Sequence, residues 1–294
     1  MVSAIAVSDT LERLATGCEW AEGPVWLPAP GRVRFSDVPG NRVLEWHAAT
    51  GETTVYSHDS GFANGRTLDR EGRVVQCSHG RRQVERDDAG TITSLCAEWQ
   101  GRRFNSPNDV VVTSDGAVWF TDPPYGIHES GREGHPAEPE YGGCFVFRFD
   151  PSSGEVAAVI TDMVHPNGLA FSPDETTLYV ADTGYLQIEG APRAIRAYRV
   201  RDGEVAEGRE VVAVTPGATD GLRVDVDGRI WSSSADSVQV FSHDGALLER
   251  IAVPETVSNV CFGGPDGTDL FITATTSLYR LRTTTRDAAA VRSR

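Results

Sequence analysis

Six short polar side chains recur along the chain, each directly before an apolar run and 39 to 59 residues from the next. They are Glu22, Asn64, Asn108, Asn167, Asp220 and Asn259. Carboxylate and carboxamide oxygens bind hard or borderline divalent cations, among them calcium, magnesium, manganese, zinc and iron(II). Such chemistry requires a fold that gathers residues far apart in the sequence around one point.

Asn and Asp also have a purely structural use at strand starts, where they satisfy the backbone of turns. Glu22 and Asp220 shift the balance, because two like charges that converge are costly unless something neutralises them. A divalent cation would do so directly. The pattern leaves the structural and the cation-binding interpretations open.

The six residues follow an internal repeat. Each segment contains an apolar strand, a Gly or Asp turn, a second strand, a loop, a third strand, a turn and a fourth strand. In the third segment the strands are expected at Asp109–Thr113, Ala117–Thr121, Cys144–Phe149 and Glu155–Ile160. Short β-branched runs bounded by Asp-Gly or Ser-Gly indicate antiparallel hairpins. Six repeats of four antiparallel strands predict an all-β, six-bladed β-propeller.

The ring must also close. The last segment supplies too few strands for a full blade and ends near Leu278–Leu281, so we expect Thr10–Thr16 at the N-terminus to add its outer strand. The chain, 1–294, then forms a single propeller domain with an ordered core over residues 10–282 and a frayed tail over residues 283–294.

In this topology the loops between second and third strands share a face with the six polar residues, which should converge near the central axis. The longest such loop is Pro123–Gly143, which carries His128, Glu129, Arg132, Glu133, His135, Glu138 and Glu140. A second long loop covers Thr183–Arg193. Long loops in a compact domain are typical of lids and binding loops, with solvated disorder as the alternative. His165 should reach the same mouth, as a substrate contact or as loop packing.

Composition excludes several classes of function. The net charge is −15 and every one of the 27 basic side chains is Arg, so the chain has no Lys. This charge argues against a nucleic-acid or anionic-membrane partner, and the lack of Lys excludes Schiff-base chemistry and a P-loop. No Gly-x-Ser-x-Gly elbow and no His-x-His or His-Glu-x-x-His pair occurs. Without a signal-like or membrane-length apolar run, we expect a soluble cytoplasmic protein.

Five cysteines, Cys18, Cys77, Cys96, Cys144 and Cys261, are widely scattered without a Cys-x-x-Cys spacing. We interpret them as small buried apolar residues of a reducing compartment. The surface pattern specifies no oligomeric state.

From about Cys18 to Leu281 the sequence resembles the gluconolactonase and regucalcin (senescence marker protein) family of propeller hydrolases. The resemblance is carried by Glu22-Gly-Pro-Val-Trp, Phe35-Ser-Asp-Val-Pro-Gly-Asn-Arg, Ser106-Pro-Asn-Asp-Val-Val-Val, Trp119-Phe-Thr-Asp-Pro, Pro166-Asn-Gly-Leu-Ala-Phe-Ser-Pro-Asp and Thr219-Asp-Gly-Leu-Arg-Val-Asp. These phrases are individually weak, but their order and spacing make the resemblance strong.

The resemblance implies one divalent metal ion held by Glu22, Asn167 and Asp220, with Asn108 at the metal or on a metal-bound water. It also implies hydrolysis of a small-molecule sugar lactone to the aldonic acid. In regucalcin an arginine close before the channel asparagine contacts substrate. Here the run is Arg103-Phe-Asn-Ser-Pro-Asn108, so an insertion displaces that arginine.

The resulting hypothesis is metal-assisted lactone hydrolysis in which the ion polarises the carbonyl and Asp220 accepts a proton from the attacking water. Glu22 and Asn167 would hold the ion, and Asn108 would orient water or substrate. The expected substrate contacts are Asn64, Asn108, Arg103, His128, Glu129, His135 and His165.

Three alternatives keep the same fold. A phosphotriesterase, like the diisopropylfluorophosphatases and paraoxonases, would use the same ion but prefers an apolar funnel. A non-catalytic binding propeller would keep the ion as a structural element, and the long Pro123–Gly143 loop speaks against it. A strictosidine-synthase-like condensation without a catalytic metal is the remotest of the three.

Overall fold

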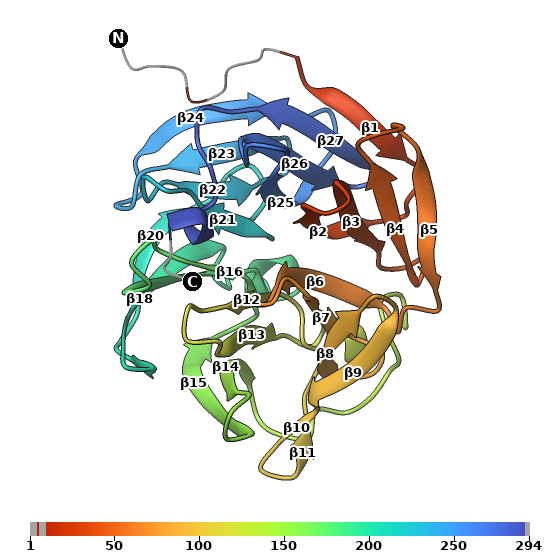
Figure 1. The fold of residues 1–294 in the computed structure, drawn as a ribbon. Helices are drawn as coiled ribbons and strands as arrows, with labels where there is room; N and C mark the ends of the chain where they lie inside the picture. The colour runs from red at the N-terminus through yellow and green to blue at the C-terminus, as the bar shows by residue number, and fades with distance from the viewer. Residues whose placement is uncertain (1–4, 6–9, 292–294) are drawn as a thin grey trace.

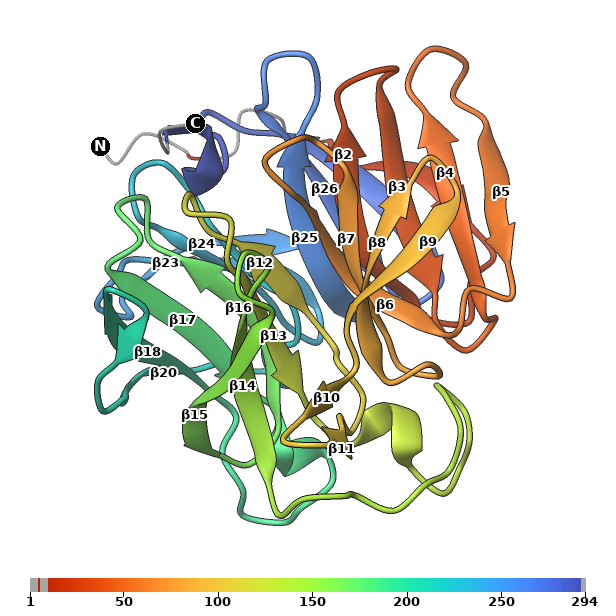
Figure 2. The same cartoon turned by 60° about the horizontal axis from the view of Figure 1, so that its bottom comes forward.

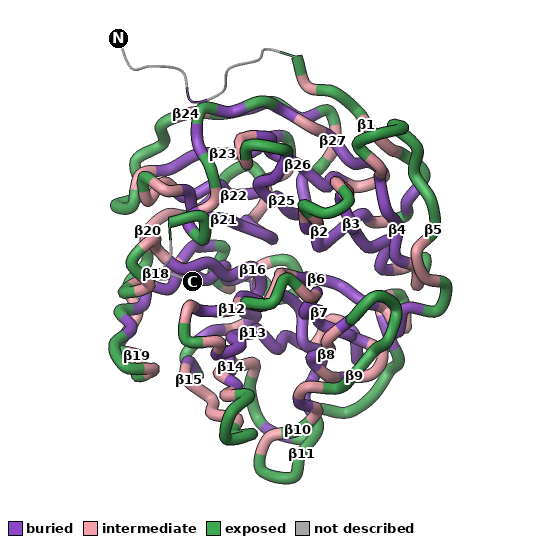
Figure 3. The backbone as a smooth tube through the Cα atoms, in the orientation of Figure 1, coloured by how far each residue is buried: buried purple, intermediate pink, exposed green. Residues whose placement is uncertain are grey.

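The computed structural model describes Ile5 and residues 10–291. Six antiparallel sheets of four main strands each are arranged around a central axis, which confirms the predicted six-bladed β-propeller (Figure 1). The first strand of each blade contacts the first strands of its two neighbours, so these six strands form the inner ring. Buried residues concentrate on the inner strands and exposed residues on the outer ones (Figure 3).

The strands of each blade, from the axis outward, are as follows. Blade 1 is β2 (Ala21–Leu27), β3 (Arg32–Asp37), β4 (Arg42–His47) and β5 (Thr53–His58). Blade 2 is β6 (Ala63–Leu68), β7 (Val74–Ser78), β8 (Gln83–Asp88) and β9 (Thr91–Cys96). Blade 3 is β12 (Val110–Val112), β13 (Val118–Asp122), β14 (Cys144–Asp150) and β15 (Glu155–Met163).

Blade 4 is β16 (Pro166–Phe171), β17 (Thr177–Asp182), β18 (Ala194–Arg201) and β20 (Arg209–Ala213), with β19 (Glu204–Val205) paired to the end of β18. Blade 5 is β21 (Leu222–Val224), β22 (Ile230–Ser233), β23 (Ser237–Phe241) and β24 (Leu247–Ala252). Blade 6 is β25 (Val257–Gly263), β26 (Asp269–Ala274), β27 (Ser277–Arg282) and β1 (Glu12–Thr16).

Short elements lie outside the blades. They are the hairpin β10 (Glu98–Trp99) and β11 (Arg102–Arg103) and the 3₁₀ turns η1 (Tyr125–Ile127), η2 (Gly184–Leu186) and η3 (Ala288–Val291). No helix among the described residues is long and apolar enough to span a membrane.

The hydrophobic core lies between neighbouring blades, because each twisted sheet presents alternate side chains to the next sheet. Trp119 of blade 3 and Phe171 of blade 4 illustrate the packing, with ring centroids 5.2 Å apart in an edge-to-face arrangement. Cys77, Cys96 and Cys261 are buried in such layers, as expected of small apolar residues.

The ring closes through the N-terminal strand, as predicted. β1 pairs antiparallel with β27, with Glu12 opposite Arg280 and Thr16 opposite Ser277. The observed strand begins at Glu12, two residues later than expected. Closure by strands from the two ends of the domain joins blade 6 into one continuous sheet.

The expected frayed tail differs from the structure over its described part. Thr283 N donates to Thr268 O at 2.9 Å, and Asp287 forms an isolated bridge with Asp225 of blade 5. Ala288 is 1% exposed within the core between blades 4 and 5. The backbone bonds and this buried alanine hold the tail against the propeller as far as Val291, and residues 292–294 lie outside the described part.

Two glycines allow neighbouring strands of the inner ring to pack closely. Gly65 N donates to Asn108 O of the next blade at 2.8 Å, and Gly168 N donates to Asp220 O at 2.9 Å. A Cβ atom on Gly65 would lie 2.6 Å from Asn108 O, and one on Gly168 would lie 2.3 Å from Asp220 O. Gly65 and Gly168 directly follow Asn64 and Asn167, which open their strands. The close approach of neighbouring inner strands therefore requires glycine at both positions.

Gly168→Ala tests this contact. Overpacking against a backbone carbonyl should cost about 1–3 kcal/mol of stability, measured by urea unfolding. Gly142→Ala is the matched control, because a Cβ there meets nothing within 4 Å. Equal stability of the two variants would contradict a steric role for Gly168.

Candidate functional site

The residues that open the inner strands converge at one end of the axis, as predicted. Five of the six, Glu22, Asn64, Asn108, Asn167 and Asn259, are 2 to 5% exposed, whereas Asp220 is partly exposed. Their side chains lie on inner strands or just before them, so each blade contributes one residue to the cluster. Asp220 is the member most open to a ligand.

Backbone bulges help to aim these side chains. The pairing register shifts between Glu22 and Val25 in blade 1, between Ala63 and Arg66 in blade 2, and between Pro166 and Leu169 in blade 4. A bulge bends a strand locally and re-aims the side chains beside it. The irregularity therefore lies where the polar residue has to leave the sheet pattern and face the axis.

Hydrogen bonds join members of the cluster across blade boundaries. Asn259 Nδ2 donates to Glu22 Oε2 at 3.0 Å, which links blade 6 to blade 1. Asn167 hydrogen-bonds to Asp220 and also donates to Thr183 Oγ1 at 3.3 Å. These contacts orient both carboxylates from their neighbours and leave further oxygen lone pairs for a ligand.

His79 completes the cluster and was missed by the sequence analysis. It follows β7, is 0% exposed, and lies with Nε2 3.2 Å from Asn64 Nδ2 and 3.4 Å from Asn108 Nδ2. Its Nδ1 lies 3.1 Å from the backbone oxygen of Glu133. The ring therefore connects two of the predicted residues with the long loop of blade 3.

The electrostatics of the cluster are dominated by acids. Burial is the largest cause that raises the pKa of Glu22, to about 7, with the Asp109 and Glu133 carboxylates adding to it and the Asn259 hydrogen bond opposing it. Burial also raises the pKa of Asp220, and the Glu22, Glu133 and Asp109 carboxylates reinforce the shift. Like charges that face one another in a desolvated place favour a bound cation or a proton.

Arg223 partly neutralises the negative charge near the cluster. Its Nη1 lies 3.5 Å from Asp109 Oδ2 and donates to Leu222 O at 2.7 Å. Arg66 is fully buried on β6 and donates to Gly23 O and Ser36 Oγ. Both arginines bond other groups. The hydrogen-bonding side chains next to the Glu22 and Asp220 carboxylates are therefore the amides described above.

The segment 123–143, called here the mouth loop, covers this end of the axis as an ordered structure. It leaves blade 3 and extends beneath blade 2, and η3 lies at the opposite end of the molecule (Figure 2). Ala137 N donates to Ile127 O at 3.1 Å, and the His135 ring makes an edge contact with Phe62 at 5.4 Å between centroids. The structure shows this loop ordered, and its use as a lid stays a prediction.

A second contact ties the mouth loop to the loop of blade 4. The hydroxyls of Tyr125 and Thr183 are hydrogen-bonded, and Thr183 also accepts from Asn167. Burial raises the pKa of Tyr125 beyond its ordinary range, so its phenol stays protonated. Tyr125 and Thr183 are two further residues that the sequence analysis did not select.

The predicted substrate contacts divide into two groups. Asn64, Asn108 and His165 lie at the cluster, and the buried His165 Nδ1 has no hydrogen-bond partner among the described residues. His128, Glu129 and His135 are exposed on the mouth loop.

Arg103 is placed elsewhere. It lies exposed in the β10–β11 hairpin, where its Nη2 donates to Arg81 O and its backbone N–H donates to Glu140 Oε2. The insertion that displaces Arg103 from the asparagine therefore gives it a role in holding the mouth loop. The Glu133 carboxylate, by contrast, contributes to raising the pKa of both Glu22 and Asp220.

The donor set fits a divalent cation. Glu22, Asn108, Asn167 and Asp220 offer only oxygen ligands, and burial has already removed much of the water from the two carboxylates. Among the described residues no group of three or more His, Cys, Asp or Glu side chains is spaced to hold a metal. The expected set of two acids and two amides does not require such a group.

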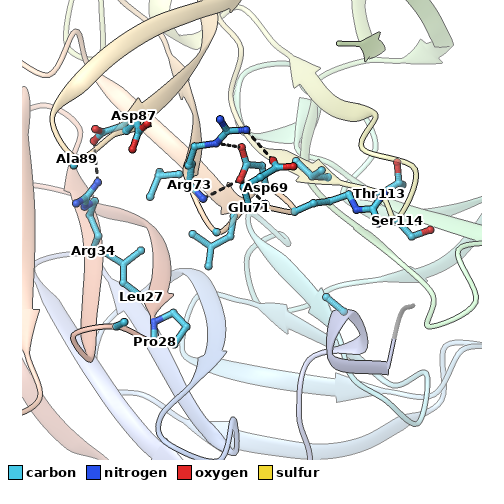
Figure 4. Close-up of a pocket in the computed structure, with 18 residues that line it drawn as sticks. Leu27, Pro28, Arg34, Asp69, Glu71, Arg73, Asp87, Ala89, Thr113 and Ser114 are labelled. Carbon is cyan, nitrogen blue, oxygen red and sulfur yellow. Dashed lines mark hydrogen bonds and ion pairs between the residues drawn. The ribbon is translucent and has the colours of Figure 1, made fainter. Parts of the chain in front are cut away.

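A cavity of about 780 Å³ lies at the other end of the blades (Figure 4). It is lined by residues at or just after the ends of inner strands, such as Leu27, Asp69 and Thr113, and several of its charged side chains are paired with one another. Arg73 bonds Asp69, and Arg34 bonds Asp87 at 2.8 Å. The six polar residues that open the inner strands do not line this cavity, so it is not the site that the repeat predicts.

The buried His79 ring makes stability depend on pH. Burial lowers its pKa from 6.5 to about 4, so the unfolded chain binds the proton more readily and the stability contributed by the neutral ring is lost as pH falls from about 6.5 towards 4. When the pH is lowered from 7.5 to 5, the free energy of unfolding of the metal-free wild-type protein should fall by about 2 kcal/mol more than that of the His79→Gln variant. Urea unfolding of both proteins at the two pH values measures this difference. Equal decreases in the free energy of unfolding would contradict it.

Comparison with known proteins agrees with the fold. The family model described as "SMP-30/Gluconolactonase/LRE-like region" matches residues 20–276. A gluconolactonase of Zymomonas mobilis is 32% identical over 95% of this chain and 83% of its own, and a pentonolactonase of Haloferax volcanii is 30% identical over 88% and 82%. A solved gluconolactonase of Xanthomonas campestris is 39% identical, with a TM-score of 0.88 over 95% of this chain and 92% of that one. The chain belongs to the SMP-30/gluconolactonase/LRE-like family.

Proposed function

We propose that this protein is a metal-dependent lactonase that opens the ring ester of a sugar lactone to the aldonic acid. The observation that carries the proposal is the gathering of two carboxylates and two carboxamides, from four different blades, next to an ordered polar loop. The names of the relatives, gluconolactonase and pentonolactonase, support the same reaction class and a sugar-derived substrate.

Glu22, Asn167 and Asp220 would hold the divalent ion, with Asn108 completing the set or binding a water beside it. When bound, such an ion supplies a Lewis acid that polarises the lactone carbonyl, a contribution of several kcal/mol to lowering the barrier. Asn259 fixes one oxygen of Glu22 through its 3.0 Å hydrogen bond, so the other oxygen is the one available to the ion.

Asp220 is proposed as the general base. It is the most exposed member of the cluster, so water and substrate can reach it, and Asn167 holds it by a hydrogen bond. In the metal-free protein burial and the neighbouring carboxylates raise its pKa, and a bound cation would oppose this shift. Its proton-accepting role is worth roughly 10²–10⁴-fold in rate.

Polar groups around the mouth suit a substrate with several hydroxyls. Among the described residues the Nδ1 of His165 has no hydrogen-bond partner, and its ring contacts Tyr125 of the mouth loop. Asn64 and Asn108 each present a carboxamide. Glu133 adds a carboxyl group on the mouth-loop side. His128, Glu129 and His135 lie further out on the loop, where they would contact the distal part of the sugar.

Neutralising either carboxylate should remove metal and activity together. For Glu22→Gln and Asp220→Asn we expect kcat/KM on D-glucono-δ-lactone to fall at least about 100-fold, with less than one metal ion per chain by elemental analysis. Asp202→Asn, at an exposed residue paired with Arg201, is the control and should match the wild-type protein. Unchanged turnover in Asp220→Asn would refute its assignment.

The substrate class is tested with a panel of γ- and δ-sugar lactones against aryl phosphotriesters, each with and without a chelator. We expect turnover of sugar lactones only, with loss of activity in chelator and recovery on adding one of calcium, magnesium, manganese, zinc or iron(II). Faster phosphotriester hydrolysis would overturn the lactonase proposal, and full activity in chelator would overturn its metal dependence.

A further inference from the structure

We propose that His79 is a positioning residue with two separate jobs: Nε2 orients the carboxamides of Asn64 and Asn108, and Nδ1 anchors the mouth loop. The inference rests on the proposed function, because it concerns the same site. It goes beyond it by assigning a residue that neither binds the ion nor touches the substrate.

The hydrogen bonds determine which ring nitrogen carries the proton. The backbone oxygen of Glu133 can only accept, so Nδ1, 3.1 Å away, must donate. In the neutral ring Nε2 is then an acceptor, and it lies within 3.4 Å of the amide nitrogens of Asn64 and Asn108. Both carboxamides therefore turn their NH₂ groups towards the ring.

This orientation decides what the two amides offer to a ligand. Once the NH₂ group is committed to His79, the remaining polar atom of each side chain is the carbonyl oxygen. Oxygen is the atom that a hard cation or a sugar hydroxyl needs, whereas an NH₂ group facing the ion would repel it. Partners that orient ligand side chains in this way typically contribute 10–100-fold to metal affinity or activity.

The mouth loop is docked directly on the same ring. A Cβ atom on Gly126 would lie 2.5 Å from His79 Cβ, and one on Gly134 would lie 2.1 Å from Gly126 O. No side chain fits between His79 and the loop, so the loop of blade 3 is held on blade 2 by glycine contacts and the Nδ1 bond to Glu133. That bond also fixes the backbone from which the Glu133 carboxyl enters the site.

Two substitutions separate the two jobs. Asn places its amide nitrogen where Nδ1 lies, so His79→Asn keeps a donor for the Glu133 carbonyl and loses the acceptor for the amides. Gln places its amide oxygen where Nε2 lies, so His79→Gln keeps the acceptor and loses the donor. His47→Asn and His47→Gln are matched controls, because His47 lies on β4 with its Nε2 3.0 Å from Thr54 Oγ1.

The readouts are Mn²⁺ binding by calorimetry, KM on D-glucono-δ-lactone, and tryptic cleavage after the exposed Arg132 of the mouth loop. In His79→Asn, Mn²⁺ affinity should fall about 10–100-fold while cleavage stays at the wild-type rate. In His79→Gln, affinity should hold within about threefold while cleavage accelerates about tenfold and KM rises. The His47 variants should match the wild type in every readout.

Equal effects of the two His79 substitutions, or no effect of either, would overturn the proposal. If neither variant folds, ¹⁵N spectra of the histidine-labelled wild-type protein decide, since one ring must show a protonated Nδ1 and an unprotonated Nε2 at pH 7.5; its absence refutes the assignment. If the wild type turns over no lactone and binds no Mn²⁺, the proposed function fails, while the cleavage and tautomer measurements still test His79.

Discussion

Contact between neighbouring inner strands is the constraint on which the rest of this structure depends. At Gly65 and Gly168 the backbone N–H of one blade bonds the carbonyl of the polar residue that opens the next, and no side chain fits between them. These contacts fix the distance between blades where the polar side chains leave the sheets. The site is therefore as rigid as the ring, although its members lie up to 237 residues apart, as Glu22 and Asn259 do.

Buried acidic and basic side chains both lie along the central axis. Burial raises the pKa of Glu22, Asp220 and Asp109 at the mouth, and the Asp109 carboxylate adds to the shifts of the other two. The buried Arg223 pairs with Asp109 and donates to Leu222 O, while Arg66 is held by backbone and hydroxyl partners. With every basic side chain an Arg, the protein has no flexible ammonium group that could enter the mouth and neutralise it. The negative field at the mouth is left for a ligand.

Repetition made most of the fold predictable. The short polar residue followed by an apolar run recurs because every blade solves the same packing problem, so the six opening residues and the closing strand followed from sequence. His79 could not be found in this way, since it follows a second strand in a Ser-His-Gly turn that no other blade repeats. The positions of Arg103 and of the tail depend on tertiary contacts with Glu140 and Asp225, which local patterns do not encode. The roles of the site residues stay predictions.

The mouth loop has a consequence for how proteins of this architecture diversify. It is an insertion between β13 and β14, so its length and composition can change without altering the pairing register of any blade. Yet it packs on the neighbouring blade through the contact of Gly126 with His79 and the hydrogen bond between His79 and Glu133 O, which restricts where a changed loop can lie. Under the proposed function, a change of this one peripheral segment could alter substrate selectivity while the site residues on the inner strands stay the same, provided that the Gly126 contact with His79 is retained.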